Sequence, residues 1–178
     1  MIYRIFFAIS FTMLFLLTPF KSVESSTNLN AHEHGSATLN IAVDGDSLFL
    51  EFESPAVNIV GFEHAAETDQ QTTAIKQAID KLQNFDAVLL LPDTAECHLI
   101  TASADWISEH SADLAESGHT EFHAEYHLNR AQIGRLGYID VPLLSLFPDI
   151  EEIDVQAIMP NRQFATELNA GNRRINLQ

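Results

Sequence analysis

Residues 118–128, with the sequence GHTEFHAEYHL, alternate between two kinds of side chain. In an extended chain successive side chains point to opposite faces, so odd-numbered and even-numbered positions lie on different faces. The odd face contains only residue types that bind metals: His119, Glu121, His123, Glu125 and His127. The even face is apolar from 122 to 128. The pattern predicts a strand with one buried face and one face suited to metal binding.

The spacing of the three histidines limits how they can bind an ion. A strand rises about 3.3 Å per residue, so His119 lies roughly 13 Å from His123 and roughly 26 Å from His127 at Cα. A zinc–nitrogen bond measures only about 2.0–2.1 Å, so the three cannot share one ion on a straight strand. The face therefore forms two sites, or one site plus spare residues, and a neighbouring strand or loop must supply the missing ligands. The alternative is the solvated polar face of an edge strand.

Three more histidines are candidate zinc ligands. His32 and His34 lie two residues apart in HEHG, so in an extended segment both can turn to one side and chelate an ion. His64 follows Glu63, an oxygen donor, in GFEHA. The alternatives are a polar terminus for the first pair and a hydrogen-bonded loop residue for His64. His98 and His110 are weaker candidates.

Charge and motifs exclude several functions. The chain has 9 basic and 25 acidic residues, a formal charge of -16, which is the wrong sign for nucleic acid or anionic lipid and the right sign for cations. The sequence contains no H-E-x-x-H, G-x-S-x-G, P-loop or glycine-rich nucleotide fingerprint. The composition therefore favours a metal-binding role without catalysis, although acidity that serves only solubility is the simpler alternative.

The first 25 residues have the pattern of an export signal. Arg4 precedes an apolar run over 5–17, which is short for a membrane span and ends near Pro19. A retained anchor is the alternative. We expect residues 1–25 to be a signal peptide and 26–178 to be one exported domain, with no membrane contact after cleavage. Cys97 is the single cysteine of the chain, so it has no intramolecular disulfide partner, and burial is the favoured environment.

Alternating apolar residues on both sides of Asp44-Gly45-Asp46 predict a hairpin that positions the candidate ligands. Thr68 and Gln71 form a capping box before a helix whose apolar stripe includes Ile75 and Leu82. Residues 86–92 suggest a short buried strand, 96–107 a longer one, and 151–168 a second hairpin. The predicted fold is α+β: a predominantly antiparallel sheet with one main amphipathic helix packed on it.

Five segments of the chain form a recognisable set: HEHGSATLNIAV, ESPAVNIVGFEHA, ECHLI, HTEFHAEYHL and LFPDIEEIDVQAIMPNRQFATEL. Together they resemble the DUF2796 family of exported Gram-negative proteins, which includes the zinc-regulated periplasmic zinc-binding protein ZrgA. The resemblance implies a periplasmic protein that binds zinc and assists zinc uptake, with a zinc ABC importer and its solute-binding protein as partners. It assigns metal binding to His32, His34, His64, His119 and His123. Family members usually carry a second cysteine where this chain has Asn129 and Arg130.

The sequence thus predicts an exported, non-catalytic zinc-binding protein that captures Zn²⁺ and assists its uptake. The expected metal ligands are His32, His34, His64, His119, His123 and His127. We expect His32, His34 or His64 to complete the sites of the 119–127 strand. Two alternatives stay open: a metalloenzyme with an open zinc site, in which Glu121 or Glu125 acts as a base on bound water, and an envelope protein that binds a partner without metal.

Overall fold

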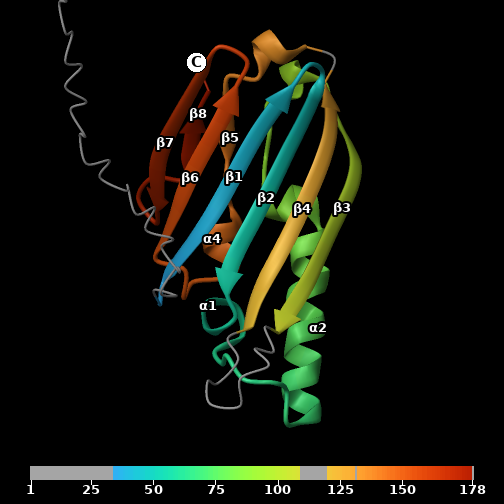
Figure 1. Cartoon of the computed structure of the whole chain (residues 1–178), viewed down its shortest axis with the longest axis vertical. Coiled ribbons are helices and arrows are strands. Elements are labelled where there is room, and N and C mark those ends of the chain that lie inside the picture. Colours follow the sequence, from blue (N-terminus) through green and yellow to red (C-terminus); the bar gives the residue numbers. More distant parts are fainter. Residues whose placement is uncertain (1–33, 109–119, 131, 178) are drawn as a thin grey trace, which may run out of the picture.

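A six-stranded sheet forms one layer of the described fold (Figure 1). The computed structural model describes residues 34–108, 120–130 and 132–177. The expected signal peptide (1–25), His32, His110 and His119 lie outside these ranges. The sheet order is β3-β4-β2-β1-β6-β7. The strands are β1 (Ser36–Asp44), β2 (Ser47–Pro55), β3 (Cys97–Ser108), β4 (Thr120–Arg130), β6 (Glu152–Met159) and β7 (Arg162–Asn169).

The hairpin predicted around Asp44-Gly45-Asp46 is confirmed. β1 and β2 pair antiparallel from Thr38–Glu53 to Asp44–Ser47, and Gly45 has a φ of 54°, which a residue without Cβ adopts at little cost. The 151–168 hairpin is also confirmed, as β6 and β7. β6 lies parallel to β1, so the sheet is mostly and not entirely antiparallel.

Helix α2 (Asp69–Gln83) packs against the sheet, as its apolar stripe predicts. Thr68 is the N-cap, and its hydroxyl accepts a hydrogen bond from the Gln71 backbone N–H at 3.2 Å. The Gln71 side chain in turn accepts from the Glu67 backbone N–H. The buried Tyr126 of β4 donates its hydroxyl to the Leu82 carbonyl at 2.6 Å, which joins the strand to the helix. Burial raises the pKa of this phenol, so Tyr126 remains a donor.

The other described elements are short and lie outside the six-stranded sheet. They are α1 (Val57–Val60), α3 (Phe85–Val88), η1 (Asp93–Ala95), η2 (Ile133–Arg135), β5 (Tyr138–Asp140), α4 (Leu143–Leu146) and β8 (Arg174–Asn176). β5 and β8 form a separate two-stranded sheet. The short strand predicted over 86–92 is wrong. Residues there form α3 and then a single bridge from Leu90 to Asp140. Periodicity alone cannot tell whether a short, continuous apolar run forms a buried helical turn or a strand.

The segment SPAVNIVGFEHA contains a buried asparagine that fixes the start of β1. The Asn58 side chain accepts a hydrogen bond from the Gly35 N–H at 2.8 Å and donates to the Ser36 carbonyl at 2.8 Å. It also donates to the Ser54 hydroxyl. Gly61 ends α1 with a φ of 81°, the left-handed conformation that glycine tolerates best. The segment therefore anchors the beginning of β1, beside His34, to the end of β2.

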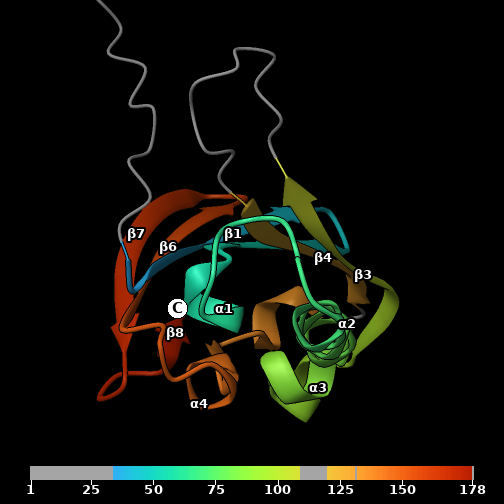
Figure 2. The same ribbon diagram turned by 90° about the horizontal axis from the view of Figure 1, so that it is seen from below.

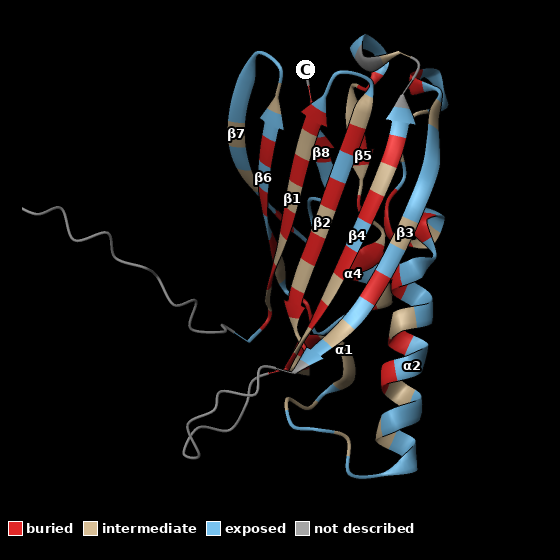
Figure 3. Ribbon diagram, turned by 45° about the vertical axis from the view of Figure 1, so that its right-hand side comes forward, coloured by how far each residue is buried: buried red, intermediate tan, exposed pale blue. Residues whose placement is uncertain are grey.

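The sheet has two unlike faces. Figure 2 shows α1, α2, α3, α4 and β8 on one side of it, which we call the inner face. Side chains buried on the inner face alternate with side chains of the opposite, outer face along β1, β2, β4 and β6 (Figure 3). The predicted fold class, an α+β domain with one main helix on a mostly antiparallel sheet, is confirmed. No helix in the described ranges is long and apolar enough to cross a membrane.

Candidate metal centre

The candidate metal centre lies on the outer face, where β2 and β4 are neighbours. The register pairs Glu53 with His123 and Glu51 with Glu125. Phe52 and Phe122 are buried on the inner face, so their sequence neighbours Glu51, Glu53 and His123 point outward. Glu51, Glu53 and His123 each offer one ligand atom, and these three atoms lie within 4.8 Å of one another.

Distances in this cluster suit a tetrahedral ion. The His123 Nε2 lies 3.0 Å from Glu51 Oε1 and 3.8 Å from Glu53 Oε1. Zinc bonds to nitrogen and oxygen are about 2.0–2.2 Å, so two ligand atoms at a tetrahedral angle lie about 3.4 Å apart. The observed distances fall on both sides of that value. Among the described residues, one imidazole and two carboxylates therefore fit three positions of a zinc ion and leave a fourth open.

The carboxylates also set the proton affinity of His123. Burial by itself lowers the pKa of this imidazole. The hydrogen bond to Glu51 and the charges of Glu51, Glu125 and Glu53 act in the opposite direction and together raise the pKa above 6.5. A proton and a divalent cation are attracted by the same charges, so protons compete with zinc for the His123 nitrogen.

Neighbouring strands support the cluster but leave it accessible. Asn40 of β1 donates a hydrogen bond of 3.4 Å to Glu51 Oε2, which leaves Oε1 directed at His123. The His123 side chain is 21 % exposed and each of the two carboxylate side chains is 43 % exposed. Ions can therefore reach the cluster directly from solvent.

Three of the other predicted histidines lie in the described ranges, and none of them belongs to the cluster. His34 is exposed, with Nε2 3.7 Å from Glu63 Oε1. His64 is also exposed, and its Nδ1 lies 2.8 Å from the Ala65 carbonyl oxygen. His127 stacks on Phe49, with ring centroids 4.5 Å apart and an angle of 9° between the rings. The Nε2 of His127 is buried and has no hydrogen-bond partner among the described residues. Metal binding by His34, His64 and His127 remains a prediction.

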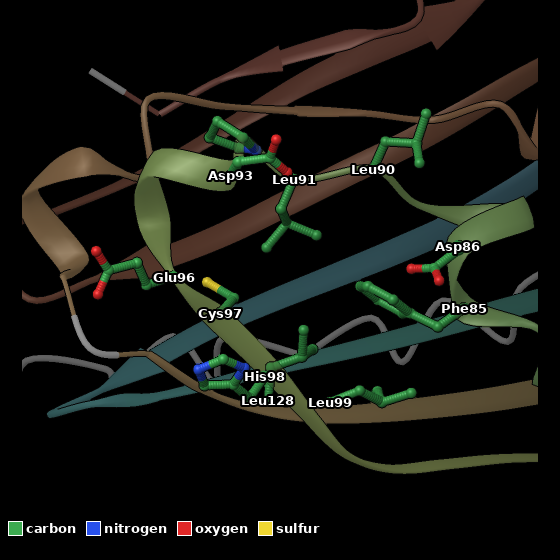
Figure 4. A pocket seen from close by; sticks show the side chains of 11 residues that line it. Phe85, Asp86, Leu90, Leu91, Asp93, Glu96, Cys97, His98, Leu99 and Leu128 are labelled. Atoms are coloured by element: carbon green, nitrogen blue, oxygen red, sulfur yellow. The ribbon is translucent and has the colours of Figure 1, made fainter.

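A hollow of about 610 Å³, away from the cluster, is lined by Cys97 and His98 among other residues (Figure 4). It lies between the start of β3 and the segment from α3 to η1. Cys97 is half-buried, whereas the sequence predicted a buried cysteine, and His98 is exposed. In Figure 4 the Glu96 carboxylate points away from the Cys97 sulfur. Within the described ranges, the Glu51–Glu53–His123 cluster is the one group of three ligands close enough to hold an ion.

Most of the chain matches a known protein family. Residues 31–177, which include the whole cluster, match the model of the ZrgA family zinc uptake protein. The chain belongs to the ZrgA family of zinc uptake proteins. The family resemblance drawn from the sequence is therefore confirmed, and the family's role is in transport and not in catalysis. No curated protein matches the chain at a significant level.

Glu51 and Glu53 of this ZrgA-family chain are candidate ligands that the sequence pattern did not predict. The pattern required ligands from a neighbouring strand, but we expected histidines to provide them. The signal was present in SLFLEFES, where Glu51 and Glu53 alternate with buried residues and thus share the outward face with Phe49. What the sequence did not contain was the pairing of β2 with β4, which brings these carboxylates beside His123.

Proposed function

We propose that this protein captures zinc in the periplasm at the Glu51–Glu53–His123 cluster and passes it to the solute-binding protein of a zinc ABC importer. It acts as an exported accessory of zinc uptake, not as an enzyme. The observation that supports this most is the cluster itself: three ligand atoms at zinc-compatible distances in a chain of a zinc uptake family.

The form of the cluster suits capture and release better than permanent binding. A structural zinc site has four protein ligands, whereas this cluster offers three, all partly exposed. An incoming ligand from a receiving protein can occupy the open position before the cluster releases the ion. The single imidazole also makes binding sensitive to protons, which favours release where the pH is low.

Growth under zinc limitation tests the proposed function. A strain of the source bacterium that lacks this gene should grow poorly in medium with a zinc chelator, and the wild-type gene should restore growth. The Glu53→Gln variant should restore it only partly or not at all, because it removes a charged ligand and conserves side-chain volume. Added zinc should rescue every strain.

Asp80→Asn is the matched control. Asp80 is an exposed carboxylate of α2, which lies on the opposite side of the sheet from the cluster. This variant should support growth like the wild type. Equal growth of the Glu53→Gln and wild-type strains under chelation, with equal protein levels, would contradict the assignment of this cluster to zinc uptake.

A further inference from the structure

Charge on the outer face of the sheet has one sign. Outward positions of the six strands, within the described ranges, carry no Lys or Arg. They carry nine carboxylates: Asp44, Glu51, Glu53, Asp105, Glu121, Glu125, Glu152, Asp154 and Glu167. Such a face attracts a basic protein surface and repels a second copy of itself and an anionic membrane.

An apolar hollow of about 430 Å³ opens within this acidic face. Phe49, Ile158 and Ala42 line it, together with His127, whose ring stacks on Phe49. Phe49 is 43 % exposed and Ile158 is 54 % exposed, and both side chains line this one hollow. An apolar floor surrounded by charge is typical of a protein-binding surface.

The hollow adjoins the metal cluster directly. Glu51 is both a member of the cluster and a lining residue of the hollow. Glu125, whose carboxylate lies 4.0 Å from His123 Nε2, also lines it. A side chain bound in the hollow therefore lies next to a zinc ligand, where it can disturb the hydrogen bond from Asn40 to Glu51.

We infer that this outer-face hollow is the docking site of the zinc-receiving protein, which inserts an apolar or aromatic side chain flanked by Lys or Arg. The inference rests on the proposed function, because it names the surface through which zinc leaves the cluster. Charge complementarity selects the occupant: a basic protein surface gains from the nine carboxylates, whereas a second copy brings nine more. Docking then places the ligands of the receiving protein at the open position of the zinc ion.

Association with the purified, zinc-free solute-binding protein of the importer tests this inference. Phe49→Ser and Ile158→Ser should each weaken association of the zinc-loaded protein at least about 10-fold, because truncation of a central apolar contact typically costs that much. Transfer of zinc to the receiving protein should slow by a similar factor. Raising the salt concentration from about 0.05 M to about 0.3 M should weaken wild-type association further, because salt screens the carboxylates.

Ile100→Ser is the matched control, since Ile100 is 55 % exposed but lies at the bulge of β3, outside the hollow. It should leave association unchanged, and all three variants should bind zinc as tightly as the wild type. If transfer is normal in Phe49→Ser and Ile158→Ser, the docking site is wrong and the proposed function stands. If the wild type binds no zinc, the proposed function fails first. Self-association of the protein that Phe49→Ser abolishes would instead make a second copy the occupant and overturn the inference.

Discussion

Replacing His123 by alanine is expected to lower zinc affinity at least about 100-fold. Loss of an outer partner of a metal ligand typically costs 10- to 100-fold, and loss of the ligand itself costs at least the upper end of that range. His123 supplies the single nitrogen of the Glu51–Glu53–His123 cluster, and its Nε2 lies 3.0 Å from Glu51 Oε1 and 3.8 Å from Glu53 Oε1. Competition with a fluorescent zinc chelator at about pH 7.5 measures the change.

His98→Ala is the control for this experiment, because His98 is an exposed outer-face histidine of β3, away from the cluster. Its zinc affinity should stay within about 3-fold of the wild type. His127→Ala shows which of the two β4 histidines belongs to the tight zinc site. If the cluster at His123 is the tight site, this variant also keeps its affinity. A larger loss in His127→Ala than in His123→Ala would place the tight site at the Phe49–His127 stack instead.

Zinc affinity is expected to fall by about 10- to 100-fold as the pH drops from about 7.5 to about 5.5. Zinc binds the neutral imidazole, and the pKa of His123 is raised above 6.5 by Glu51, Glu125 and Glu53. Below that pKa, each pH unit costs up to tenfold because one proton competes with the ion. Dialysis at half-unit pH steps measures the curve. A fall that begins only below about pH 5, where carboxylates protonate, would show that His123 is not a ligand.

In the zinc-free protein, the contribution of His123 to folding stability should decrease as the pH rises, whereas zinc affinity increases. A group whose pKa is higher in the folded state adds stability below its unfolded pKa, and this stability is lost as the pH rises through the folded pKa. His123 therefore favours the zinc-free fold more at about pH 6 than at about pH 8. Bound zinc reverses the preference, since it stabilises the fold most where it binds most tightly. Melting curves of the wild type and His123→Ala, with and without zinc, separate the two contributions.

Local features of the fold could be predicted from the sequence with good accuracy. The Asp44-Gly45-Asp46 turn and the Thr68 cap depend on neighbouring residues, so the chain itself contains the information. The strand with alternating histidines and glutamates is confirmed as β4 from Thr120 onward. The error over 86–92 occurred where a short apolar run fits both a strand and a helical turn.

The metal centre could be predicted only in part, because it depends on strand order. The distance argument on β4 was sound: in the described part of the strand, His123 lies in the cluster and His127 lies against Phe49. The residues beside His123 come from β2, about 70 positions earlier in the chain. Sequence pattern gives the outward face of each strand, but it does not give the register between strands distant in sequence. For that reason Glu51 and Glu53 could be recognised as outward-facing but not as neighbours of His123.

Locating the bound ion is the most direct test of the central claim, that zinc binds at the Glu51–Glu53–His123 cluster. Crystals of the zinc-loaded protein, measured on both sides of the zinc absorption edge, give the position of the ion from its anomalous signal. We predict a strong peak about 2.0–2.2 Å from His123 Nε2 and from one oxygen each of Glu51 and Glu53. A fully occupied peak elsewhere, with none at this cluster, would contradict it.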